Sequence, residues 1–275
     1  MKAEYETIAK EQYCVLSDGS ELRILQTKAT EKTRTKLTLF IIPGWATIIP
    51  SWDNVLMEAK NFFNIVYCET REKGSSKLVK KTKTDLNRHS ADIQEIITQL
   101  NLDQKKLILL ASSFGAMIAA HGLSHKKINP LLTVLVGVTS RIDLPPTTRY
   151  LIPISPPFVF TMFKPIAKFW IKKFKSEDKK QADKYLRVLE EADAKKWKAA
   201  AKLIMPYWHW DIYEKITSNV LVIGAEKDKM HDVDQTKKIY DLIKNASYID
   251  MGTNKDVYSK KFVTVLREFI ESINV

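Results

Sequence analysis

Ser113 is the residue of this chain whose type and setting most clearly allow chemistry. It lies in Ala111-Ser112-Ser113-Phe114-Gly115, where an apolar run stops at small residues and a second small, apolar segment follows. That pattern predicts a buried strand leading directly into a buried helix. A serine at such a bend projects its hydroxyl above the sheet edge, and the N–H of Phe114 faces any charge developing on an attacked carbonyl. Small residues where a helix crosses a strand would give the same pattern without chemistry.

The elements that would position this serine alternate between strands and helices. An Asp-Gly turn at residues 18–19 predicts a hairpin, and isoleucines spaced along residues 87–100 predict an amphipathic helix. Strands separated by helices imply an α/β fold with a mostly parallel central sheet flanked by helices. The predicted strands cover residues 12–16, 22–26, 37–42, 64–68, 131–138, 220–224 and 246–250 besides the one that begins at residue 107, and helices are expected over 235–244 and 259–273.

The alternation is interrupted once, from Asp143 to about Met205. This segment is rich in proline, aromatic residues and amphipathic helix. We therefore expect residues 1–142 and 206–275 to form one core domain, and residues 143–205 to form a helical cap, or lid, inserted into it.

Composition limits the class of protein. The chain has 275 residues, of which 45% are hydrophobic and 28% charged, as in soluble globular proteins. No apolar run has the length of a membrane span, the first residues lack a signal-peptide core, and Cys14 and Cys68 lie in strand-like runs. These features favour the cytoplasm. The net charge of +12 is spread along the chain without a nucleic-acid-binding motif, so we expect a solvated lysine-rich surface and no nucleic-acid partner.

Four segments, in this chain order, resemble the α/β-hydrolase family. Pro43-Gly44-Trp45 stands where that family commonly has His-Gly-x, and Glu69-x-Arg71-x-x-Gly74-x-Ser76 resembles its D-x-R-G-x-G-x-S. Residues 111–115 resemble its nucleophile elbow, G-x-S-x-G, with Ala111 for the first glycine. Gly224-Ala225-Glu226-Lys227-Asp228 resembles the G-x-x-x-D that carries the acid of the catalytic triad.

The resemblance implies a role for each matching residue and covers nearly the whole chain, with the weakest match in the cap. Ser113 would be the nucleophile and Asp228 the acid, and the N–H groups of Trp45 and Phe114 would form the oxyanion hole. The triad histidine should follow the last strand, but Asn254 occupies the matching position and no histidine follows His231. An asparagine amide cannot act as a base, so we expect little or no turnover from this sequence.

Three explanations remain open for Asn254: an engineered His→Asn substitution, a natural loss that leaves a binding protein, or a base recruited from elsewhere. His231, three residues after Asp228, fits a loop histidine as well as a base.

The cap suggests the kind of ligand. Phe158, Phe160 and Met162 in the cap, together with Trp208, are expected to wall an apolar pocket over Ser113 for an acyl chain or another hydrophobic ester, although plain packing of a cap helix would explain the same residues. The five lysines from Lys164 to Lys175, which alternate with apolar residues of the cap, hint at weak contact with an anionic membrane.

The sequence thus favours a serine hydrolase of carboxylic or thio esters, impaired by Asn254. The alternative is a non-catalytic binding protein for a small hydrophobic ligand. No metal or organic cofactor is implied, and the sequence does not indicate an oligomeric state.

Overall fold

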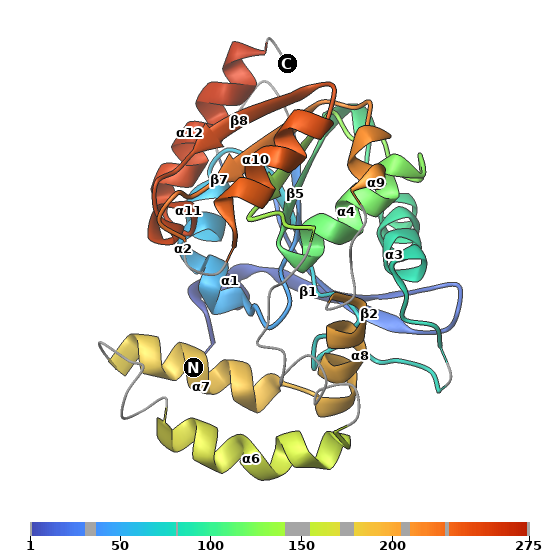
Figure 1. Ribbon diagram of the computed structural model, residues 1–275, viewed down its shortest axis with the longest axis vertical. Helices are drawn as coiled ribbons and strands as arrows, with labels where there is room; N and C mark the ends of the chain where they lie inside the picture. The colour runs from blue at the N-terminus through green and yellow to red at the C-terminus, as the bar shows by residue number, and fades with distance from the viewer. Residues whose placement is uncertain are drawn as a thin grey trace.

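A computed structural model describes residues 2–30, 37–80, 82–140, 155–170, 179–204, 210–228 and 231–273. Its centre is an eight-stranded sheet in the order β1-β2-β4-β3-β5-β6-β7-β8 (Figure 1). β1 pairs antiparallel with β2 and β2 with β4, whereas all other neighbours are parallel. The predicted α/β fold class is therefore confirmed. The strands are β1 (Lys10–Val15), β2 (Glu21–Thr27), β3 (Thr38–Ile42), β4 (Asn64–Cys68), β5 (Leu107–Ser112), β6 (Leu132–Val136), β7 (Val220–Gly224) and β8 (Ala246–Asp250).

Helices cover both faces of the sheet, because the parallel strands carry apolar side chains on both sides. Phe40 and Ile42 of β3 pack into the core on one face, and Leu39 and Ile41 into the core on the other. The helices that pack on the face of Phe40 and Ile42 are α3 (Leu86–Gln99), α4 (Phe114–Ser124), α9 (Asp211–Glu214) and α10 (Val233–Leu242). Those that pack on the face of Leu39 and Ile41 are α1 (Glu4–Ile8), α2 (Ile49–Ala59), α11 (Asn254–Val257) and α12 (Lys260–Ser272). A 3-10 turn, η1 (Gln104–Lys106), precedes β5.

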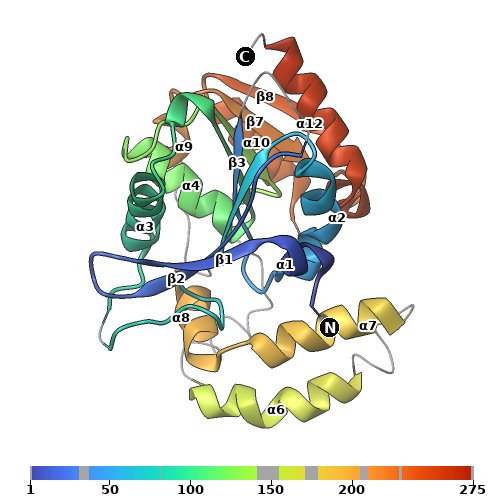
Figure 2. The same cartoon turned by 180° about the vertical axis from the view of Figure 1, so that it is seen from behind.

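Three helices between β6 and β7 lie together beyond one end of the sheet, in the region predicted as a cap (Figures 1 and 2). They are α6 (Pro157–Trp170), α7 (Lys179–Glu191) and α8 (Ala194–Ile204). α7 is tied to the core by Arg187, which donates two hydrogen bonds of 2.8 Å to Glu6. α8 is tied to it by Lys196, whose amino group donates to the carbonyls of Lys73, Gly74 and Ser76 in the loop after β4.

That loop also touches α7 directly. A Cβ atom at Gly74 would lie 2.1 Å from the Glu191 carbonyl oxygen, so only glycine lets the two backbones approach this closely. Among the described helices, none is long and apolar enough to cross a membrane.

Candidate active site

Ser113 lies between β5 and α4 in a strained backbone conformation. Its φ of 50° and ψ of −113° are unusual for a residue with a side chain. Its N–H donates to the Val136 carbonyl at 2.9 Å, and its own carbonyl accepts from Met117 at 3.1 Å. These bonds hold the bend in place. Strain of this kind is concentrated at functional sites, and here it lifts the serine out of the regular strand and helix.

The bend requires small residues on both sides. A Cβ atom at Gly115 would lie 2.3 Å from the Ile42 carbonyl oxygen, and one at Gly44 would lie 3.1 Å from the Ser113 Cβ. The turn after β3 therefore reaches the serine directly. Ala111 is fully buried in β5.

The same turn carries Trp45, the residue expected to provide one oxyanion donor. Ala46, which follows it, is also strained, with a φ of 57°. The Gly44 carbonyl accepts a 2.6 Å hydrogen bond from the buried amino group of Lys73, which also pairs with Glu72 at 3.0 Å. Phe114, the other expected donor, opens α4, where N–H groups have no partner inside the helix. Both residues thus border the Ser113 bend.

Asp228 is positioned by the turn after β7, and its side chain is only 7% exposed. Its N–H donates to the Ala225 carbonyl at 2.9 Å. Its carboxylate accepts a 2.8 Å hydrogen bond from Nδ1 of His231. The sequence suggested no contact between these two side chains beyond their spacing of three residues, so this partner of Asp228 is a finding of the structure.

Asn254 is the first residue of α11, where the loop after β8 ends. Thr253 caps this short helix by accepting from the Asp256 N–H at 3.1 Å. Asn254, Asp228 and His231 line one small pocket at the ends of β5, β6 and β7. Ser112 and Tyr258 also line it, with their hydroxyl oxygens 3.3 Å apart. The structure therefore brings the predicted acid and the residue at the histidine position to the same place, together with an unpredicted imidazole.

A larger cavity of about 360 Å³ opens beside Trp45, between the turn after β3 and the helices α6 and α8. Phe160 and Trp197 line it, and the Trp197 ring centroid lies 5.4 Å from the centroids of both Trp45 and Phe160. Its walls are mostly apolar, with Pro156, Pro157, Val159 and Ala201 among them.

Two of the other residues predicted to line the pocket are not found among the described residues that line this cavity. Phe158 and Met162 are 66% and 60% exposed on the outer side of α6, because residues two apart on a helix point in different directions. Trp208 lies outside the described residues. Trp197 was not predicted, since it stands in a lysine-rich segment that resembled solvated surface.

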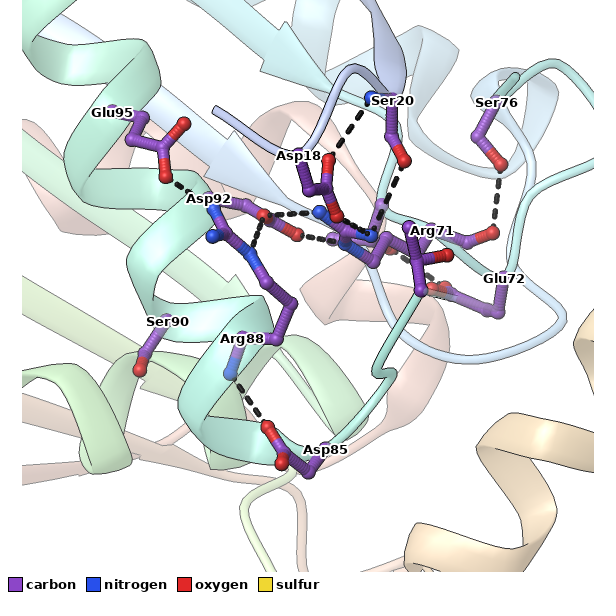
Figure 3. Close-up of polar contacts among 12 residues, drawn as sticks. Asp18, Ser20, Arg71, Glu72, Ser76, Asp85, Arg88, Ser90, Asp92 and Glu95 are labelled. Atoms are coloured by element: carbon purple, nitrogen blue, oxygen red, sulfur yellow. Dashed lines mark hydrogen bonds and ion pairs between the residues drawn. The ribbon is translucent and has the colours of Figure 1, made fainter. Parts of the chain in front are cut away.

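An ionic network holds the loop after β4 against the hairpin and α3 (Figure 3). Arg71 is 1% exposed and bonds to both carboxylate oxygens of Asp92, at 2.6 and 2.8 Å, and to Asp18 at 2.8 Å. Ser76 donates to the Arg71 carbonyl. Burial alone would raise the pKa of Asp18, but the hydrogen bonds from Arg71 and Ser20 and the positive charge of Arg71 together outweigh it, and the pKa falls to about 2. The network thus fixes the loop that carries Glu72 and Lys73.

Comparison with known proteins supports the architecture. No protein-family model and no curated protein sequence matches this chain. Solved structures do. An esterase from Exiguobacterium antarcticum has a TM-score of 0.73 at 17% identity, covering 95% of this chain and 100% of its own. A hydrolase from Pseudomonas aeruginosa PA01 has a TM-score of 0.71 at 16% sequence identity, and the match covers 96% of this chain and 97% of that one. The enol-lactonase from Burkholderia xenovorans LB400 has a TM-score of 0.71 at 14% sequence identity, and the match covers 96% of this chain and 100% of that one. With its eight-stranded, mostly parallel sheet, this chain has the α/β-hydrolase fold.

Proposed function

We propose that this protein is a serine hydrolase that cleaves carboxylic or thio esters with an apolar acyl group through an acyl-enzyme. The observation that carries the proposal is the strained bend at Ser113, which packs against Gly44 of the turn after β3. Ser113 Oγ would attack the acyl carbonyl, and the N–H groups of Trp45 and Phe114 would stabilise the resulting oxyanion. The alcohol or thiol would leave, and water would then release the acyl group from the serine.

This mechanism requires a base that accepts the hydroxyl proton of Ser113. In α/β-hydrolases a histidine in the loop after the last strand takes it, and here that position is Asn254. An amide has no useful basicity, so we expect turnover well below that of a complete triad.

The cavity beside Trp45 is the site we propose for the acyl chain. Its volume of about 360 Å³ and its aromatic and proline walls suit an apolar group held next to the oxyanion donors. The helices α6 to α8 would then act as the cap, because α6 and α8 form the outer wall of this cavity.

We further propose that α6 contacts an anionic lipid surface. Four large apolar side chains on this helix, Phe158, Met162, Ile166 and Phe169, are between 60% and 66% exposed. An exposed apolar row in a basic segment is typical of helices that lie in a membrane interface.

The function is tested with p-nitrophenyl esters from acetate to palmitate. We expect slow hydrolysis that prefers longer acyl chains and is abolished by Ser113→Ala. Ser124→Ala is the matched control, because it removes a hydroxyl at the far end of α4 and should keep activity within a few-fold. Equal hydrolysis by the Ser113→Ala variant would refute the proposed nucleophile. No hydrolysis of any ester, with saturable binding of a fatty acid, would favour the binding protein.

A further inference from the structure

We infer that His231 takes the proton of Ser113, in place of the histidine that is missing after β8. This inference rests on the proposed function, since it assigns the base of the same reaction. It starts from the hydrogen bond between His231 and Asp228, the residue that resembles the triad acid.

The hydrogen bond determines which ring nitrogen is basic. Asp228 Oδ2 lies 2.8 Å from Nδ1 of His231, and an ionised carboxylate can only accept. Nδ1 of the neutral imidazole must therefore carry the hydrogen, which leaves the lone pair on Nε2. This is the arrangement that a serine hydrolase needs, with the acid holding one nitrogen and the other free to accept the serine proton.

The ring also lies at the right strand ends. It packs on Gly137, where an added Cβ atom would lie 3.0 Å from Nδ1 and the backbone φ is +53°. Gly137 follows Val136, whose carbonyl accepts the Ser113 N–H at 2.9 Å. The imidazole is thus over the end of β6, the strand beside the one that leads to the serine. A glycine at 137 permits this approach.

The other described histidines have different surroundings. His89 is 2% exposed and its ring lies edge-on to the Phe114 side chain, with centroids 5.3 Å apart; burial lowers its pKa. His121 hydrogen-bonds to Ser90 and stacks on His125, with ring centroids 4.1 Å apart. Among histidines in the described part of the chain, His231 alone has a hydrogen bond to Asp228. Its side chain is 16% exposed, which leaves it shielded but within reach of a ligand.

His231 would carry one proton through both halves of the reaction. Nε2 accepts the proton as Ser113 Oγ bonds to the acyl carbon, and the imidazolium then gives this proton to the departing alkoxide or thiolate. Water repeats the exchange on the acyl-enzyme. Ser113 Oγ makes no hydrogen bond to the ring in this structure, so bound substrate must bring the two together, as is common for catalytic contacts.

Chemical rescue tests the inference. We expect His231→Ala to lower the kcat for the preferred ester about 100-fold or more, the range for loss of a general base. Added imidazole should restore part of this activity in His231→Ala and none in Ser113→Ala. His231→Gln keeps an N–H donor for Asp228 and should be as impaired as the alanine variant, while His125→Ala, an exposed histidine, should match the unaltered chain.

Each other result has a distinct meaning. If His231→Ala keeps kcat within threefold while Ser113→Ala abolishes it, the inference is overturned and the proposed function stands. If His231→Ala is impaired but the folded His231→Gln keeps kcat within threefold, or imidazole fails to rescue His231→Ala, His231 positions Asp228 and is not the base. If the unaltered chain shows no Ser113-dependent hydrolysis, both the proposed function and the inference fail.

Discussion

Asn254 shares its pocket with Asp228 and His231, at the first position of α11. Changing Asn254 to histidine would place a second imidazole in the loop after β8, where α/β-hydrolases carry their base. We expect about a tenfold or larger gain in Ser113-dependent ester hydrolysis. The gain should persist in the His231→Gln background, because the added ring can then take Asp228 as its partner. Asn254→Gln is the control and should bring no gain in a p-nitrophenyl ester assay.

A result without gain in either background would contradict this expectation. It would mean that the side chain at 254 cannot reach Ser113 in this fold, whatever its chemistry.

Local sequence patterns predicted part of the site. An apolar run that stops at small residues predicts a bend, and the structure places Ser113 between β5 and α4 as this pattern predicted. The contact of His231 with Gly137 joins residues far apart in the chain and left no local signal. Phe158 and Met162 were chosen by composition alone, and composition does not say which side of a helix faces a cavity.

At the scale of elements, the exposed row on α6 predicts how the protein meets lipid. Positions 158, 162, 166 and 169 are spaced by four, four and three residues and lie on one face. In both views α6 is the outermost element of its end of the molecule (Figures 1 and 2). Residues 155–170 and 179–204 also hold nine lysines and one arginine against four acidic residues. Apolar insertion and charge attraction would therefore act on the same end.

We expect the protein to co-sediment with vesicles containing phosphatidylglycerol more strongly than with phosphatidylcholine vesicles, and less at high salt. Phe158→Ser with Ile166→Ser should weaken binding at least about tenfold, because each buried apolar side chain contributes about 1.5–3 kcal/mol. Val15→Ser with Val79→Ser, at exposed valines elsewhere, is the matched control. Equal binding by both double variants would exclude α6 as the docking face.

The sequence predicted the sheet well and the shorter helices poorly. Central strands such as β4 and β7 appear at the predicted residues, because a strand buried on both faces is a continuous apolar run. α2 was not among the predicted helices, although a proline in the first turn, here Pro50, is common at the start of a helix. α9 and α11 have only four residues each, which is too short for a periodic pattern.

At the scale of the whole molecule, buried ion pairs join segments that are distant in the chain. Arg71 connects the loop after β4 to Asp18 of the hairpin and Asp92 of α3. Arg88 of α3 bonds to Asp92 as well and donates to Ser17. Glu6 of α1 pairs with Arg187 of α7. Burial raises the pKa of Glu6, but the hydrogen bonds from Arg187 and Ala3 and the nearby arginine charges together outweigh it, so the pKa is lowered. Removing one partner from such a network leaves a buried charge, so the fold depends on the protonation of these carboxylates.

Acid should therefore weaken the folded state in a defined range of pH. The pKa of Asp18 falls from an ordinary value of 3.8 to about 2 in the fold, so the unfolded chain binds more protons between these values. The stabilisation from Asp18 is then complete above about pH 4 and is lost as the pH falls towards 2.

We expect Asp18→Asn to reduce the free energy of unfolding by about 1.5–3 kcal/mol at pH 6, the usual value of a hydrogen bond to a charged group. Between about pH 4 and pH 2 the variant should lose less stability than the unaltered chain, as measured by urea unfolding. Glu271→Gln is the control, because Glu271 is 73% exposed and lies 3.9 Å from Arg267. Parallel loss of stability in Asp18→Asn and the unaltered chain over this range would show that the acid sensitivity resides in other carboxylates.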